Sequence, residues 1–257
     1  MNHYKPTSII AANPDFDRTI NKYDRDFLNV AEFFCDTIQG EGINTGCPAA
    51  FLRLQDCTMN CVWCDTRSVW RYGNPYTFEE LFYMMDQVEL PKKLFEGQHL
   101  VLTGGSPLKQ QAMLVKFLWE FTNRYDFLPY IEIENECTLM PIPEMVNLVK
   151  IWNNSPKLAN SGNIKELRIQ PKILNYLNKL SNSWFKFVVE GTDEEWQEIE
   201  EDFLPHIKKS QIILMPMAGS RAELERNRER VVQLTIQKGV RYCTREHVEI
   251  WDKMTGV

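Results

Sequence analysis

Short runs of β-branched and aromatic residues alternate with longer segments of helical period from about residue 49 onward. This alternation is typical of an α/β fold. The runs predicted to be strands are 49–54, 99–103, 130–134, 149–152, 184–189 and 211–216, with a last one at 240–244. Roughly six βα units in a row predict a curved parallel sheet covered by helices, as a complete barrel, a partial barrel or a doubly wound open sheet.

Three predicted helix starts carry a capping box, in which a hydroxyl and a carboxylate three residues later each satisfy a free backbone N–H. The pairs are Thr77 with Glu80, Thr192 with Glu195, and Ser220 with Glu223. Roughly the first 30 residues are polar and irregular, so residues 1–30 are expected to form an N-terminal extension. Residues 31–257 contain no linker-like tract and are expected to form one core domain.

Charge and hydropathy exclude two classes of partner. The chain has 29 Lys and Arg against 35 Asp and Glu, a net charge of −6, so no global basic field exists to hold nucleic acid. No apolar run approaches the ~18 residues of a membrane span, and the start lacks the layout of a secretory signal. We expect a cytoplasmic protein that acts on a small molecule, without a nucleic-acid or membrane partner.

Three of the seven cysteines fall within eight residues, as Cys57-x3-Cys61-x2-Cys64. Structural zinc normally takes four ligands, often as two CxxC or CxxH pairs, and no second pair occurs in the sequence. A four-iron cluster held by three cysteines leaves one iron open to a ligand that carries amino and carboxylate groups. The spacing favours such a cluster, with zinc or three incidental cysteines as the alternatives.

The segment CTMNCVWC, residues 57–64, resembles the CxxxCxΦC signature of the radical S-adenosylmethionine superfamily, where Φ is an aromatic residue. Further segments resemble, in order and spacing, the 7-carboxy-7-deazaguanine synthase family. They are FCDTIQGEG (34–42), FLRLQDC (51–57), LTGGSP (102–107), NSPK (154–157) and KFVV (186–189). The resemblance implies the partial (β/α)6-type barrel of the radical S-adenosylmethionine class.

The resemblance also implies an activity. Members of the family are lyases in which a 4Fe–4S cluster, here on Cys57, Cys61 and Cys64, binds S-adenosylmethionine and generates a 5′-deoxyadenosyl radical. The radical takes a hydrogen atom from 6-carboxy-5,6,7,8-tetrahydropterin, which contracts to 7-carboxy-7-deazaguanine with loss of ammonia, a step of queuosine-type biosynthesis. Mg²⁺, a reductant such as flavodoxin or ferredoxin, and a homodimer are expected with it.

The residues that match the family's site are carried over as expectations. Arg53 alternates with Leu52 and Leu54 on a strand, so it faces the barrel interior, where it needs an anion from the substrate carboxylate or a structural salt bridge. The expected substrate-binding residues are Ile38, Gln39, Gly40, Arg53 and Thr103. The expected S-adenosylmethionine-binding residues are Trp63, Asp65, Gly104, Gly105, Ser155, Pro156 and Lys157. Thr66 is expected to bind Mg²⁺.

One position departs from the family pattern. The turn after the second predicted strand usually reads GGEP, and Ser106 stands here in place of the acid, which meets the ammonium of the methionine part in the superfamily. The loss of the acid is expected either to weaken cofactor binding or to shift its role to Glu132 or Glu134 on the next strand. Lys186 is interpreted as a surface residue. His247 and Trp251 resemble a tail that closes over the site.

Two other functions stay open. The first is a radical S-adenosylmethionine enzyme with another substrate, such as an activase that abstracts a glycyl hydrogen from a partner enzyme. The second is a non-catalytic zinc or iron–sulfur binding module. An activase does not require the IQGEG loop with Arg53, and a binding module does not require Gly104-Gly105 or the SPK segment.

Overall fold

The computed structural model describes residues 4–12 and 26–257, and in these ranges the strands form one ten-stranded sheet. Its order is β1-β2-β3-β5-β6-β7-β8-β9-β10, and β4 pairs with β2. The strands are β1 (Thr7–Ile10), β2 (Phe27–Ile38), β3 (Pro48–Leu54), β4 (Asn74–Thr77), β5 (His99–Gly104), β6 (Ile131–Asn135), β7 (Ile151–Asn154), β8 (Ser183–Val189), β9 (Ile212–Pro216) and β10 (Arg241–Tyr242).

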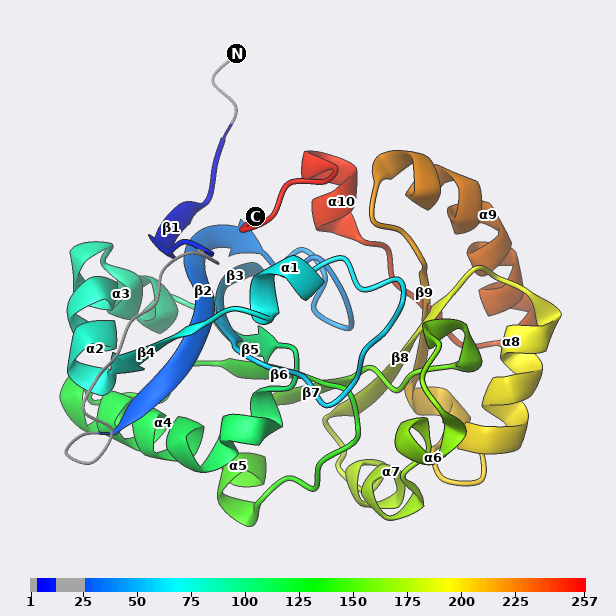
Figure 1. The fold of residues 1–257 in the computed structure, drawn as a ribbon, viewed down its shortest axis with the longest axis horizontal. Coiled ribbons are helices and arrows are strands. Elements are labelled where there is room, and N and C mark those ends of the chain that lie inside the picture. The colour runs from blue at the N-terminus through cyan, green and yellow to red at the C-terminus, as the bar shows by residue number, and fades with distance from the viewer. Residues whose placement is uncertain (1–3, 13–25) are drawn as a thin grey trace.

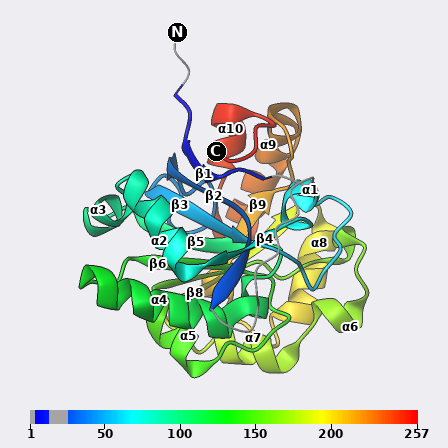
Figure 2. The ribbon, with the colours of Figure 1, turned by 60° about the vertical axis from the view of Figure 1, so that its left-hand side comes forward.

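Most of the helices lie on the outside of this sheet (Figure 1). The helices are α1 (Arg67–Trp70), α2 (Phe78–Gln87), α3 (Leu90–Phe95), α4 (Gln111–Tyr125), α5 (Pro143–Leu148), α6 (Lys165–Arg168), α7 (Pro171–Leu177), α8 (Asp193–Glu198), α9 (Arg221–Lys238) and α10 (Glu246–Trp251). Short turns of other helix types are η1 (Pro107–Gln110), η2 (Ala159–Ser161), η3 (Ile199–Phe203) and η4 (Lys209–Gln211). Figure 1 shows α2 to α9 as an outer arc, and in Figure 2 α4, α5 and α7 lie below the strands while α10 and the C-terminus lie above them.

The strand order decides among the architectures that the sequence left open. Along the sheet path β3-β5-β6-β7-β8-β9-β10 every pair of adjacent strands is parallel and the order never reverses, whereas a doubly wound sheet reverses at a switch point. The order ends at β1 and β10, so in the described residues the sheet does not close. The fold is therefore the expected partial barrel, with the carboxyl ends of the parallel strands at one rim.

The predicted strands correspond to β3 and β5 to β10, with ends that shift by one or two residues at most positions. β1, β2 and β4 have no counterpart among them. β2 is a largely buried twelve-residue strand, antiparallel to β3, β1 and β4. In the predicted extension, residues 7–10 and 27–30 therefore pair within the sheet, and residues 1–3 and 13–25 lie outside the described residues.

Two of the three predicted capping boxes are complete, those of Thr77 with Glu80 and Thr192 with Glu195. The third is half formed: Ser220 accepts from the N–H of Glu223, but the Glu223 carboxylate accepts from the N–H of Gly219. All three helices begin where the sequence predicted.

The main core lies between the sheet and the helical arc. Within it Phe82 stacks on Phe117 and also contacts the tilted ring of Phe121. This apolar layer holds the strands rigidly while leaving their carboxyl ends free to carry polar side chains. Among the described helices, none has the length and apolar character needed to cross a bilayer.

Candidate active site

A cavity of about 740 Å³ opens at the carboxyl ends of the parallel strands. The structure brings fifteen of the sixteen expected site residues to its wall and leaves Pro156 outside it. The lining residues are Ile38, Gln39, Gly40, Arg53, Cys57, Cys61, Trp63, Cys64, Asp65, Thr66, Thr103, Gly104, Gly105, Ser155 and Lys157. They come from the ends of β2, β3 and β5 and from the segments that follow β2, β3, β5 and β7, so the fold gathers them from four separate parts of the chain.

The three cysteines of the loop after β3 are unpaired by disulfides, and the sulfur of each accepts a hydrogen bond from nitrogen. Cys57 accepts from the Met59 backbone at 3.3 Å, Cys61 from Asn163 Nδ2 at 3.3 Å, and Cys64 from Trp70 Nε1 at 3.4 Å. Burial raises the pKa of the Cys57 thiol to about 12. A thiolate at this depth needs a bound cation, and N–H donors of this kind tune cluster ligands.

The arrangement of these sulfurs is compatible with an iron–sulfur cluster. In the described ranges no set of three or more His, Cys, Asp or Glu side chains is arranged around one ion. Each thiolate of a four-iron cluster binds a different iron, so the sulfurs need not converge on one point. The three thiols are therefore compatible with the ligand set of a four-iron cluster.

Gly104 and Gly105 let the turn after β5 approach the cysteine loop. Gly104 has φ of +134°, and a Cβ there would lie 2.3 Å from the carbonyl oxygen of Leu54. A Cβ on Gly105 would lie 2.5 Å from Cβ of Cys57. Only glycine permits this contact, which the Ser106 N–H fixes by donating to the Asp56 carbonyl at 2.8 Å.

The carboxylates of β6 and the segment after it have different partners. Glu132 is fully buried and does not line the cavity. Its carboxylate lies 2.6 Å from His99 Nδ1 and accepts hydrogen bonds from Asn44 at 2.9 Å and Asn153 at 2.8 Å. Glu134 lines the cavity and accepts from the Thr103 hydroxyl at 2.6 Å. Neither contacts Ser106, and of the two only Glu134 faces the cavity, so only Glu134 stays a candidate for the role of the missing acid. Ser106 instead donates to Glu136 at 2.7 Å.

The IQGEG loop, residues 38–42, is fixed by backbone hydrogen bonds and carries a side-chain amide group, that of Gln39, whose nitrogen is unpaired among the described residues. Its backbone is fixed where the Gln39 N–H donates to the Cys47 carbonyl at 2.7 Å and the Gly46 N–H donates to the Gln39 carbonyl at 2.8 Å. The Gln39 side chain accepts from the Glu41 N–H, while its buried Nε2 has no hydrogen-bond partner among the described residues. A buried donor in that state needs a partner, and a heterocyclic ligand offers one.

Arg53 is mostly buried at the cavity wall, where it forms one of the two predicted interactions. Its Nε donates to Glu32 Oε1 at 2.8 Å, which is a structural salt bridge. Because this bond uses Nε, the terminal amino groups stay available for a carboxylate in the cavity.

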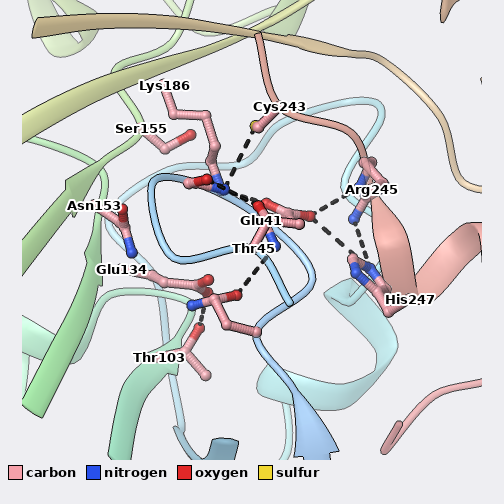
Figure 3. Close-up of polar contacts among 12 residues, drawn as sticks. Glu41, Thr45, Thr103, Glu134, Asn153, Ser155, Lys186, Cys243, Arg245 and His247 are labelled. Atoms are coloured by element: carbon pink, nitrogen blue, oxygen red, sulfur yellow. Dashed lines mark hydrogen bonds and ion pairs between the residues drawn. The ribbon is translucent and has the colours of Figure 1, made fainter. Parts of the chain in front are cut away.

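A buried ion network joins the IQGEG loop to two distant segments (Figure 3). Glu41 pairs with Lys186 on β8 and with Arg245, whose Nε lies 2.8 Å from Glu41 Oε1, and Arg245 also pairs with Asp65. Burial alone would raise the pKa of the Glu41 carboxyl, but Lys186 and Arg245 hold it well below its usual range. Lys186 is thus a buried part of the cavity wall and not a surface residue. Its partner Glu41 follows β2, a strand that the sequence did not predict.

His247 packs the C-terminal helix α10 on the IQGEG loop. A Cβ on Gly40 would lie 2.1 Å from His247 Nδ1, and the Glu246 N–H donates to the Gly40 carbonyl at 2.9 Å. Burial and the neighbouring Arg245 lower the pKa of His247 to about 4. Residues 252–257 line the cavity beyond it, so the C-terminal segment covers the site.

The residues expected to bind S-adenosylmethionine after β7 form a small cluster at the wall. Lys157 Nζ donates to Ser155 Oγ at 2.8 Å and lies 5.5 Å from the centre of the Trp63 ring. Trp63 is held by Asn160, which accepts from its Nε1 at 3.1 Å. Trp63 is therefore a fixed part of the cavity wall.

Thr66 lies at the edge of the cysteine loop, with its hydroxyl 3.8 Å from Cys64 Sγ. It precedes α1 but makes no side-chain capping bond, so the hydroxyl is not used by the helix.

Comparison with known proteins identifies the family context of this site. A family model described as a 4Fe-4S single cluster domain matches residues 38–131. The chain is 32% identical over 232 residues to a 7-carboxy-7-deazaguanine synthase of Pyrobaculum aerophilum, covering 89% of this chain and 97% of that one. It is 26% identical to that of Aquifex aeolicus, covering 74% and 78%. The crystal structure of QueE from Escherichia coli matches with a TM-score of 0.63 at 22% identity, over 86% and 95% of the two chains.

Proposed function

The chain belongs to the 7-carboxy-7-deazaguanine synthase family, and we propose that it converts 6-carboxy-5,6,7,8-tetrahydropterin into 7-carboxy-7-deazaguanine with loss of ammonia. The observation that supports this most is that Cys57, Cys61 and Cys64 share one cavity with the free amide of Gln39 and the guanidinium of Arg53. Cluster ligands and groups suited to a carboxylated heterocycle thus face the same space.

In this proposal the cysteines hold a 4Fe–4S cluster, which with S-adenosylmethionine supplies the radical chemistry. The protein's own part is to bind and orient. Gln39 Nε2 donates to the heterocycle, and Arg53 takes its carboxylate between the terminal amino groups while Glu32 fixes Nε. Thr103, whose hydroxyl donates to Glu134, is the remaining residue of the substrate-binding wall.

Enclosure of the cavity also supports radical chemistry. Arg245 and His247 tie the C-terminal segment to the IQGEG loop, and residues 252–257 lie across the cavity. Such a cover keeps out water and stray hydrogen donors, which would otherwise react with a substrate radical.

Mg²⁺ at Thr66 is a further part of the proposal. The Thr66 hydroxyl is unused by α1 and lines the cavity, and Mg²⁺ prefers oxygen ligands together with those of a bound substrate. Substrate carboxylate and hydroxyl together would then bind one ion.

A small electron-transfer protein such as flavodoxin or ferredoxin is proposed as the reductant. Val62, inside the cysteine loop, is 71% exposed, so the loop reaches the surface and offers a short electron path. The homodimer rests on the family resemblance alone and is tested by light scattering after size-exclusion chromatography. The cytoplasmic location stays a prediction.

The experiment is an anaerobic assay of the reconstituted protein with dithionite, S-adenosylmethionine, Mg²⁺ and 6-carboxytetrahydropterin, with the deazapurine followed by mass and ultraviolet spectrum. We expect product only when all components are present. Cys61→Ala should lose iron and activity, while the control Cys47→Ala, outside the loop, should keep its iron.

Two results would contradict the proposal. Deoxyadenosine without deazapurine would mean that the cluster chemistry is present but that the substrate is different, as in the activase alternative. A colourless protein with one zinc per chain would mean a binding module.

A further inference from the structure

Glu136 is a buried carboxylate with one oxygen fixed and the other unpaired. Its side chain is 4% exposed and lines the cavity. Three hydroxyls lie within hydrogen-bond distance of Oε1: Ser106 at 2.7 Å, Thr58 at 2.8 Å and Thr138 at 2.5 Å. Oε2 has no hydrogen-bond partner in the described part of the chain.

The three hydroxyls hold the carboxylate in one orientation but leave its charge uncompensated. A buried carboxylate is costly unless a cationic donor pairs with it, and no Lys, Arg or His among the described residues forms an ion pair with Glu136. The remaining oxygen is therefore a site for a positively charged N–H donor from a ligand.

Glu136 also lies beside the cysteine loop. Thr58, which directly follows Cys57, is one of its three hydroxyl partners, and Ser106 is bonded through its backbone to Asp56, which directly precedes Cys57. A ligand that contacts Oε2 therefore sits next to the first of the three cluster cysteines.

We propose that Glu136 binds the α-ammonium group of S-adenosylmethionine and thereby replaces the acid that Ser106 lacks. The inference rests on the proposed function, because it takes S-adenosylmethionine as the ligand beside the cysteines. This molecule has one protonated primary amine, on its methionine part, since the adenine amine is not basic and the sulfonium has no N–H. Ser106, which stands in place of the family's acid, holds Glu136 in position through its hydroxyl hydrogen bond.

The test is isothermal titration of the cluster-loaded protein with S-adenosylmethionine and with an analogue that has hydrogen in place of the α-amino group. Glu136→Gln keeps an acceptor for the three hydroxyls but removes the charge. We expect it to weaken S-adenosylmethionine binding roughly 10- to 100-fold and to leave the Kd of the analogue within about twofold. Glu144→Gln, an exposed glutamate on α5, is the matched control and should change neither Kd.

Ser106→Ala provides a second variant, with the carboxylate retained but one anchor removed. We expect a smaller loss, roughly threefold to tenfold, again for S-adenosylmethionine only. Iron content and thermal melting check that each variant is folded and loaded.

The outcomes separate this inference from the proposed function. Wild-type protein that binds neither compound would overturn both. Wild-type binding of S-adenosylmethionine that Glu136→Gln and Ser106→Ala leave unchanged would overturn the role of Glu136 alone. An equal loss for S-adenosylmethionine and the analogue in Glu136→Gln would also overturn it, because the ammonium would then not be the group recognised.

Discussion

Arg245 donates from Nε to Oε1 of Glu41 over 2.8 Å and so joins the segment before α10 to the loop after β2, two parts of the chain at opposite ends of the sequence. Arg245 also pairs with Asp65 in the cysteine loop. One side chain thus connects the segment that covers the cavity with the two loops that carry the expected substrate and cluster ligands.

The Arg245→Ala variant should be less stable by about 2–4 kcal/mol, because it leaves the buried Glu41 with Lys186 alone and frees α10. Urea unfolding measures this change. The matched control is Arg228→Ala, since the Arg228–Glu249 pair spans 3.4 Å with both side chains nearly half exposed. It should change stability by no more than about 0.5 kcal/mol. Equal losses in the two variants would mean that the Arg245 network does not hold the segment.

Arg53→Ala should remove most turnover, about 100-fold for the loss of a charged bidentate contact, and leave the Kd for S-adenosylmethionine within about twofold. The measurements are the anaerobic assay and isothermal titration. Because the variant also strands Glu32 without its partner, the double variant Arg53→Ala with Glu32→Gln serves as the control. It should regain stability without regaining turnover. Recovery of both, or an equal loss of turnover and S-adenosylmethionine binding, would assign Arg53 a structural role.

Thr66→Val should raise the Mg²⁺ concentration for half-maximal activity about tenfold, as expected when a ligand worth about 1.4 kcal/mol is lost. Stability should stay unchanged, since the Thr66 hydroxyl makes no capping bond. Thr77→Val is the opposite control: its hydroxyl caps α2, so about 1 kcal/mol of stability should be lost without any change in the Mg²⁺ requirement. An unchanged Mg²⁺ requirement in Thr66→Val would exclude this threonine as a ligand.

The parallel part of the fold was predictable because each of its strands is a short β-branched or aromatic run followed by a segment of helical period. β2 was not predicted, because the alternation of strand and helix marks βα units only, and β2 pairs antiparallel with β3 outside such a unit. β4 was missed for a second reason: it is four residues long and contains Pro75.

For the site, local motifs predicted what single loops carry, and pairings between loops needed the structure. The cysteine loop and the glycine turn are each contiguous in sequence. The Ser106–Glu136 contact joins residues from two successive strand ends and depends on the register of β5 against β6. Lys186 looked like a rim residue because its partner Glu41 is 145 positions away.

The pH dependence of stability should report on His247. Its pKa in the folded protein is about 4, below the ordinary value of 6.5, since burial and Arg245 oppose the charged form. Neutral His247 therefore stabilises the fold fully above pH 6.5, and this contribution is lost as the pH falls through the window from 6.5 to 4. With part of the ring exposed, the loss attributable to this group is about 2 kcal/mol.

His247→Gln removes this titration while keeping a neutral polar side chain against Gly40. Between pH 7.5 and 4 we expect the variant to lose about 2 kcal/mol less stability than the wild type, as measured by urea unfolding across that range. Other groups titrate in both proteins and cancel in the difference. His206→Gln, at a histidine that contacts Asn175 away from the ion network, should follow the wild-type curve. If the His247→Gln and wild-type curves stay parallel, the imidazole is not held neutral by its surroundings, and α10 closes over the loop by packing alone.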